Sequence, residues 1–251
     1  NVESEDGNNV YLTIDETIQS ICEKYMQKGV EDNNVLNKGV CIAMDVNTGA
    51  ILAMVTTDGY DLNNPYELSA KDKKKIKSTA KSKQAEAESA ALSNMWRNKA
   101  VADTYMPGSV FKMCVASAAL EENLVNEKTS FTCTGSIEVE GETIHCSNIS
   151  GHGTQSFVEV ISNSCNPAFI QIGQMLGAGK FRQYYQGFGF SDKTGIDLPG
   201  EADDEFWAEG KMGGVDLAVA SFGQNFAITP IQMITACAAV SNGGYVVQPH
   251  V

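Results

Sequence analysis

The sequence predicts a mixed fold of the α/β or α+β class, in which helices pack against a β-sheet. Two apolar segments flank Asn47-Thr48-Gly49 and have the pattern of a β-hairpin. The segment 109–124 is apolar nearly all round, as expected of a helix buried in a core. With 251 residues, of which 43% are hydrophobic and 20% charged, the chain is long enough for one large domain.

The expected N-terminal elements are a helix and this hairpin. Residues 12–29 carry apolar side chains at helical spacing and reach a stop signal at Gly29. The strands of the hairpin are "GVCIAMDV" and "AILAMVTT". Both are short and interrupted, and the sequence holds no apolar run long enough to span a bilayer.

The expected C-terminal elements are a second hairpin and two capped helices. The segment 133–146, "CTGSIEVEGETIHC", should turn at Glu140-Gly141 and bring its terminal cysteines together. Ser156 and Glu159 form a capping box that opens the helix leading to Ser164. Thr229-Pro230 opens another helix, which stops at the run Asn242-Gly243-Gly244.

The net charge of −13 argues against a nucleic-acid partner, because a phosphate-binding protein concentrates positive charge on one face. The basic run 71–83, "KDKKKIKSTAKSK", is the exception. It has no interleaved aromatic residues, so a solvated helix or a mobile loop is expected there. A site for acidic polymers or lipid head groups is the alternative.

Ser109 and Lys112 stand three residues apart where the apolar helix begins, so both should lie on one face. Free backbone N–H groups at the start of this helix would stabilise negative charge developing on Ser109. Desolvation by apolar neighbours would lower the pKa of Lys112 and let it take the Ser109 proton. The alternative is an N-cap serine and a lysine that reaches to solvent.

Five motifs stand in an order and spacing that resemble the transpeptidase domain of class B penicillin-binding proteins. They are "YMPGSVFK", "NSCN", "TGIDLPGE", "SFGQNFAITPIQM" and "SNGG". The resemblance covers nearly the whole chain, from "LTIDETIQ" onward. It implies the penicillin-binding protein/serine β-lactamase-like fold, a central antiparallel sheet flanked by helices.

The resemblance implies a role for four residues. Ser109 resembles the nucleophile and Lys112 its base, while Ser164 and Asn166 resemble the S-x-N pair of the family. Ser164 would relay a proton to the leaving amine, and Asn166 would bind Lys112 and the donor peptide. Taken alone, the S-x-N residues would equally satisfy a helix start before Pro167.

The activity implied is that of a peptidoglycan D,D-transpeptidase, which cross-links stem peptides through a serine acyl-enzyme and is inhibited by β-lactams. The implied partners are stem peptides, β-lactam antibiotics and cell-wall synthesis proteins such as a glycosyltransferase. The implied location is the extracytoplasmic face of the bacterial membrane, in an elongation-type or sporulation-type protein. A serine β-lactamase and a penicillin-sensing receptor domain are the alternative functions.

The family's third motif, K-T-G, has a false match at Lys193-Thr194-Gly195. The proline and glycine of the following "IDLPG" prevent the strand that this motif requires. In the family the motif follows "NGG", so residues 1–251 are expected to be a transpeptidase domain without its K-T-G strand, one oxyanion-hole donor and the last helix. The N-terminal pedestal and membrane anchor are expected to lie outside this chain as well.

The cysteines add a metal prediction. Cys133, Cys146, His152 and Cys165 read C-x₁₂-C-x₅-H-x₁₂-C, a Cys₃His set that suits a closed, structural zinc site. A zinc-containing subset of class B penicillin-binding proteins has ligands at similar positions, two of them aspartates where this chain has cysteines. His145 could replace His152.

The alternatives to zinc are a disulfide between Cys133 and Cys146 or three free thiols. The other cysteines are expected to be buried packing residues. They are Cys22, Cys41, Cys114 and Cys237.

Overall fold

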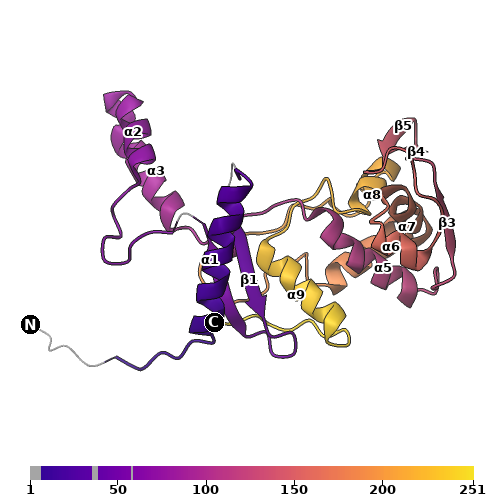
Figure 1. Ribbon diagram of the computed structural model, residues 1–251, viewed down its shortest axis with the longest axis horizontal. Coiled ribbons are helices and arrows are strands. Elements are labelled where there is room, and N and C mark those ends of the chain that lie inside the picture. The colour runs from indigo at the N-terminus through magenta and orange to yellow at the C-terminus, as the bar shows by residue number, and fades with distance from the viewer. Residues whose placement is uncertain (1–6, 36–38, 58) are drawn as a thin grey trace, which may run out of the picture.

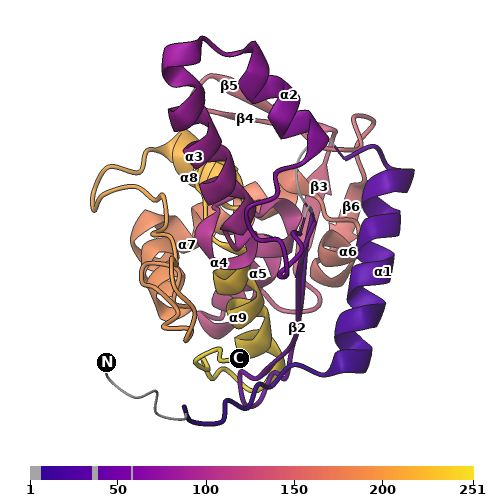
Figure 2. The same ribbon diagram turned by 90° about the vertical axis from the view of Figure 1, so that its left-hand side faces the viewer.

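The computed structural model describes residues 7–35, 39–57 and 59–251. Its centre is the antiparallel hairpin of β1 (Val40–Met44) and β2 (Ile51–Thr56). Helix α1 (Glu16–Asp32) covers one face, and α4 (Lys99–Ala102) and α9 (Pro230–Ser241) contact the hairpin from the other (Figure 1, Figure 2). The expected antiparallel sheet between helices is therefore present.

Helix α1 begins where Asp15 caps it, with the Ile18 N–H donating to the Asp15 carboxylate over 2.9 Å. It runs three residues past Gly29, which was expected to be its end. A lone glycine costs a helix only ~1 kcal/mol, less than the contacts of α1 with the hairpin supply.

The basic run forms a helix rather than a mobile loop. Helix α2 (Ala70–Ser78), the short 3₁₀ turn η1 (Lys81–Lys83) and α3 (Gln84–Trp96) make a helical hairpin that projects from the body (Figure 1). Ser69 caps α2 by accepting from the Asp72 N–H over 3.1 Å. None of the helices in the described part of the chain is long and apolar enough to cross a membrane.

The second half of the chain folds around two helices. A 3₁₀ turn, η2 (Gly108–Phe111), leads directly into α5 (Lys112–Glu121). Helix α7 (Asn166–Gly187) packs along α5 and carries a break at Gly177, where the backbone is not helical. The capping box on Ser156 opens α6 (Phe157–Ser162), as predicted.

Short strands cover the outer side of α7. The predicted second hairpin is β4 (Ser136–Val139) and β5 (Glu142–His145), and it turns through Glu140 and Gly141, both with positive φ. Strands β3 (Ser130–Cys133) and β6 (Gly153–Ser156) pair beside it. Helix α8 (Gly214–Ala220) packs on α7 from another side.

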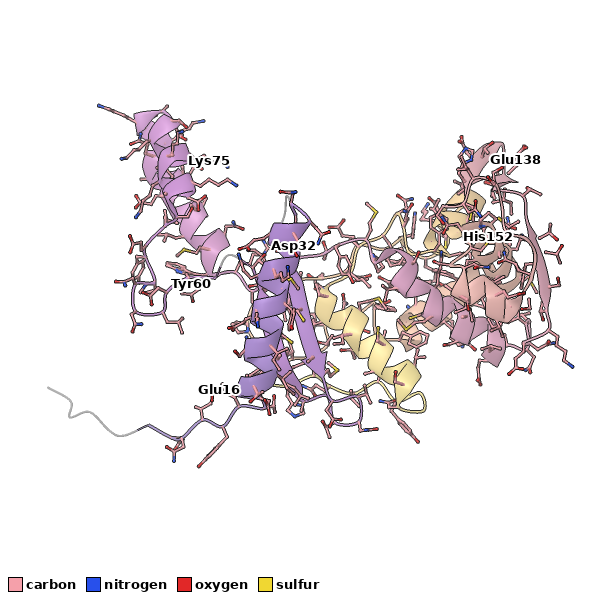
Figure 3. The ribbon with its side chains drawn as sticks, viewed as in Figure 1. Glu16, Asp32, Tyr60, Lys75, Glu138 and His152 are labelled. Carbon is pink, nitrogen blue, oxygen red and sulfur yellow. The ribbon has the colours of Figure 1, made fainter. Side chains whose placement is uncertain are left out.

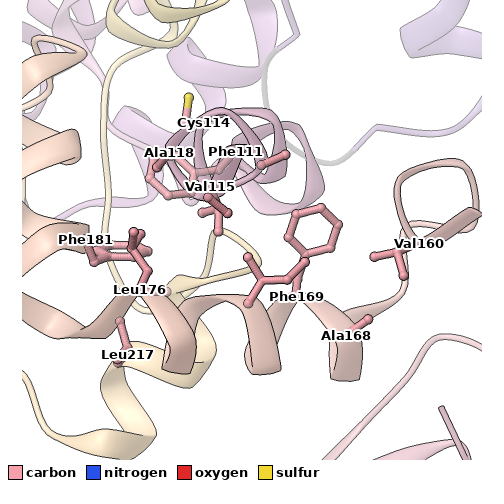
Figure 4. Packing of buried hydrophobic residues seen from close by; sticks show 14 of the residues in the cluster. Phe111, Cys114, Val115, Ala118, Val160, Ala168, Phe169, Leu176, Phe181 and Leu217 are labelled. Atoms are coloured by element: carbon pink, nitrogen blue, oxygen red, sulfur yellow. The ribbon is translucent and has the colours of Figure 1, made fainter. Parts of the chain in front are cut away.

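The main core lies between α5 and α7 (Figure 4). At its centre Phe111, only 2% exposed, contacts Phe226 with ring centroids 4.8 Å apart. Three further aromatic rings surround Phe111, those of Phe181, Tyr185 and Phe190. This packing holds η2, and with it Ser109, against the rest of the domain.

Among the expected packing cysteines, only Cys114 is fully buried. Cys22, Cys41 and Cys237 are half-buried, so the expected full burial was wrong for them, although Cys237 does pack against the main core. Cys22 and Cys41 lie at the contact of α1 with β1, close enough for Cys22 to raise the pKa of Cys41 together with burial, which is the larger cause.

Candidate active site

Ser109 lies in η2, the tight turn that precedes α5. Gly108 enters this turn with φ of 60°, a left-handed conformation that glycine adopts without strain. Ser109 lies in this turn and Lys112 is the first residue of α5, so the two residues are one turn apart. Ser109 is exposed, whereas Lys112 is only 4% exposed.

The ammonium group of Lys112 is fully engaged by the segment between α6 and α7. Its Nζ donates to the Ser164 carbonyl oxygen over 2.7 Å, to the Ser164 hydroxyl over 2.9 Å and to Asn166 Oδ1 over 2.7 Å. The nitrogen also lies 5.4 Å from the ring centroid of Phe169. The structure therefore brings together Lys112 and both members of the S-x-N pair.

Burial lowers the pKa of Lys112 to about 8, because desolvation penalises the charged form. Negative charge on Cys146 and Cys165 acts in the opposite direction. A neutral Lys112 amine is thus accessible near neutral pH, which a general base for Ser109 requires.

Ser164 adopts a strained backbone to present its oxygens to Lys112. Its φ is 49°, in the left-handed region that non-glycine residues rarely occupy. The chain turns there between α6 and α7, and Asn166 is the first residue of α7, followed by a proline that suits the first turn. Strain of this kind costs roughly 1–3 kcal/mol and is typical of functional sites.

Cys165, the residue between Ser164 and Asn166, belongs to a cluster with Cys133, Cys146 and His152. The four potential ligand atoms lie within 4.8 Å of one another, and the sulfur of Cys146 is 3.7 Å from His152 Nδ1. Tetrahedral zinc with Zn–S of ~2.3 Å and Zn–N of ~2.0–2.1 Å would separate such a pair by roughly 3.6 Å. His152 supplies the imidazole of this cluster, while the exposed His145 lies on β5.

Hydrogen-bond donors around two of the sulfur atoms favour their thiolate forms. Burial disfavours the thiolate of Cys146, yet backbone N–H groups of Asn148 and Asn166 donate to its sulfur and the pKa is lowered overall. The buried Gln155 Nε2 has no hydrogen-bond acceptor within ordinary distance among the described residues, but it lies beside Cys165 and favours its thiolate. Burial nevertheless raises the pKa of Cys165 to about 12.

All seven cysteines are free thiols, so the hairpin disulfide considered for Cys133 and Cys146 is not formed in this structure. Three buried thiols and one half-buried imidazole form a donor set that zinc prefers. These residues therefore fit a structural zinc ion, with Cys165 fixed between the two residues that bind Lys112.

Residues 39–251 match the family described as the penicillin binding protein transpeptidase domain. The chain belongs to this family. Over 247 residues it is 35% identical to Stage V sporulation protein D of Bacillus subtilis, covering 98% of this chain and 35% of that protein. Over 254 residues it is 30% identical to peptidoglycan D,D-transpeptidase PbpA of Mycobacterium tuberculosis, covering 97% of this chain and 48% of that protein.

The chain thus spans between a third and a half of the length of these curated relatives. Among solved structures, it resembles penicillin-binding protein 3 of Mycobacterium tuberculosis in complex with aztreonam, with a TM-score of 0.77, 25% identity, and coverage of 95% of this chain and 48% of that one. The transpeptidase domain of penicillin-binding protein 3 from Burkholderia pseudomallei matches with a TM-score of 0.76 and 21% identity, covering 98% of this chain and 62% of that one. The predicted family and fold are confirmed.

The false K-T-G match lies in a loop of this transpeptidase domain, not on a strand. Thr194 donates both its hydroxyl, over 2.6 Å, and its backbone N–H, over 2.8 Å, to the Glu201 carboxylate. Lys193 pairs with Asp203 over 3.4 Å. These groups are occupied by the loop itself, which agrees with the rejection of Lys193-Thr194-Gly195 as the third motif.

One residue of the transpeptidase site was missed in the sequence. The carbonyl oxygen of Gly223 accepts a hydrogen bond from the Gly108 N–H over 2.8 Å, directly before Ser109. A Cβ on Gly223 would lie 2.0 Å from the Gly108 carbonyl oxygen. The motif "SFGQ" was visible, but only the tertiary contact shows that its glycine supports the Ser109 turn.

Proposed function

We propose that this domain is a peptidoglycan D,D-transpeptidase that works through a serine acyl-enzyme and is inhibited by β-lactams. The observation that carries the proposal is the buried Lys112, one turn from the exposed Ser109 and bonded to Ser164 and Asn166. A serine nucleophile needs an adjacent base, and this lysine is the base that the site offers. The proposal places the domain at the extracytoplasmic face of a bacterial membrane.

The proposed reaction has two steps. Neutral Lys112 takes the proton of Ser109, whose oxygen attacks the carbonyl of the penultimate D-alanine of a stem peptide. The C–N bond breaks, and the departing D-alanine amine receives a proton through Ser164. The amine of a second stem peptide then attacks the ester, forms the cross-link and returns the proton to Ser109.

A product analysis separates this function from the alternatives. The full-length protein would be given a stem-pentapeptide donor and an amine acceptor, and the products would be separated by mass. A cross-linked dimer supports the transpeptidase, whereas hydrolysed donor indicates a β-lactamase-like or carboxypeptidase activity, and a stable acyl-enzyme indicates a sensing domain. Ser109→Ala should abolish every covalent product, while Ser162→Ala, an exposed serine on α6, should not.

We propose in addition that the Cys₃His cluster holds a structural zinc ion. When bound, zinc would cross-link the β-hairpin, the loop of His152 and the start of α7. This places the domain in a zinc-containing subset of its family. Elemental analysis should find one zinc per chain, and a thiol titration that finds a Cys133–Cys146 disulfide with no metal would refute the assignment.

A further inference from the structure

The basic run 71–83 forms a charged surface that the proposed transpeptidase reaction does not use. It holds seven lysines and one aspartate, a net charge of +6, so the remainder of the chain carries −19 within the total of −13. It occupies α2 and η1, which stand clear of the body in Figure 1. In Figure 3, Lys75 lies near one end of the molecule and His152 near the other.

The ammonium groups of this basic surface are available to an external anion. All seven lysines are exposed. Of these seven lysines, all in the described part of the chain, only Lys73 has an acidic partner, Glu67 at 3.1 Å, and both side chains are at least half exposed. Exposed pairs of this kind contribute little and are easily exchanged.

The lysines do not form a flat face. On α2, the half-buried Asp72 and Ile76 lie on one side of the helix, which packs against α3. At 3.6 residues per turn, the five lysines of α2 spread over an arc of about 200° on the other side. A flat bilayer reaches only part of such an arc, whereas a flexible chain follows all of it.

The chemistry of the surface points to phosphate charges. Lysine binds phosphate as a point charge, whereas bidentate recognition of a single carboxylate or phosphate group favours arginine, which this run does not contain, so the surface suits a chain of spaced charges rather than one fixed group. None of the exposed large hydrophobic side chains of the described residues lies between positions 67 and 95, so the surface has nothing to insert into a membrane. It also lacks aromatic rings on which nucleic-acid bases would stack.

We propose that residues 71–83 bind a flexible polymer of phosphodiester repeats. The acidic remainder of the domain repels the same polymer, so the projecting hairpin holds it away from the body. Counterion release drives this binding, which makes the affinity strongly dependent on salt. The interaction does not depend on the transpeptidase reaction, so the two proposals can be tested separately.

Fluorescence anisotropy of labelled poly(glycerol phosphate) with the full-length protein tests the proposal. With about five lysines engaged, the logarithm of the binding constant should fall with log salt at a slope of about −3 to −4. The triple variant K74Q/K75Q/K77Q keeps a good helix former at each position. It should bind at least tenfold more weakly at 0.1 M salt, with a slope reduced by about 2.

A matched control removes the same charge elsewhere. The variant K24Q/K128Q/K211Q changes three exposed lysines outside the basic surface and should weaken binding less than twofold. An equal loss in the two variants would show that net charge alone matters and would overturn the proposal. Tighter binding per charge to phosphatidylglycerol vesicles or to polyglutamate, or no binding of the polymer at 50 mM salt, would overturn it as well.

Discussion

The side-chain oxygen of Asn166 accepts a hydrogen bond from Lys112 Nζ over 2.7 Å. The backbone N–H of the same Asn166 donates to the sulfur of Cys146. One residue therefore joins the proposed general base to the proposed metal cluster. A change in either part should therefore alter the other.

The acylation rate should rise with pH and level off above about pH 8. Burial lowers the pKa of Lys112 to about 8, so the neutral amine that accepts the Ser109 proton becomes tenfold scarcer with each pH unit below it. Stopped-flow acylation by a fluorescent β-lactam between pH 6 and 9 measures the profile. Lys112→Arg, which stays charged, should be slower by roughly 10²-fold or more and nearly independent of pH; a flat wild-type profile would contradict the assignment.

Asn166→Asp should move this pH profile to higher values. The new carboxylate would lie within hydrogen-bond distance of Lys112 and favour its ammonium form, raising its pKa by about 1–3 units. At pH 7 the variant should acylate at least tenfold more slowly, and it should recover part of this loss near pH 9. Asn123→Asp is a control that adds the same charge outside this contact, because Asn123 is exposed beyond the end of α5. A loss in Asn166→Asp that does not recover at high pH would argue against an effect on Lys112.

Removal of the metal should both destabilise the domain and slow acylation. Without zinc, Cys146 after β5 and Cys165 before α7 are no longer joined through the metal. The turn that contains Ser164 is then less firmly held. A loss of ~3 kcal/mol would lower the unfolding midpoint by roughly 6–12 °C in a domain of this size. Calorimetry after treatment with a chelator measures this change.

Cys146→Ser should reproduce the effect of the chelator, and the chelator should then add little to it. Cys22→Ser is the matched control, because Cys22 lies half-buried on α1, outside the cluster. If the chelated wild type and Cys146→Ser both kept the midpoint and the acylation rate of the untreated protein, the cluster would have no structural metal to lose.

Local sequence signals were sufficient to predict the elements that build the site. The turn at Glu140-Gly141 and the capping box on Ser156 depend on neighbouring residues, so their chemistry is visible without the fold. The burial of Lys112 was likewise predicted from the apolar residues around it. The Cys₃His set was predicted because few other arrangements explain three cysteines and one histidine in one region.

Features that depend on distant contacts could not be predicted in this way. Helix α1 continues past Gly29 because β1 and β2 pack along it, and the half-buried Cys22 and Cys41 lie at that same contact. The role of Gly223 depends on its approach to Gly108, which is 115 positions away in the chain. Neither hydrophobic periodicity nor a capping signal indicates a contact between residues so far apart in the sequence.

Gly223→Ala should slow acylation at least tenfold, because its Cβ would meet the carbonyl oxygen of Gly108 at 2.0 Å and its nitrogen at 2.8 Å. Backbone atoms cannot rotate away, so the turn that carries Ser109 must move. The left-handed φ of 82° adds a cost of roughly 1–2 kcal/mol for any residue with a Cβ. Acylation kinetics and the unfolding midpoint are measured together.

Gly210→Ala separates the two effects, because Gly210 has a similar φ of 71° but nothing within 4 Å of its Cβ position. Both variants should lose a similar amount of stability to backbone strain, and only Gly223→Ala should lose acylation beyond that. The displacement acts on the position of Ser109 and not on the protonation of Lys112, so the midpoint of the pH profile should stay at its wild-type value. If the two variants acylated at the same rate, Gly223 would be a turn residue without a role in positioning the nucleophile.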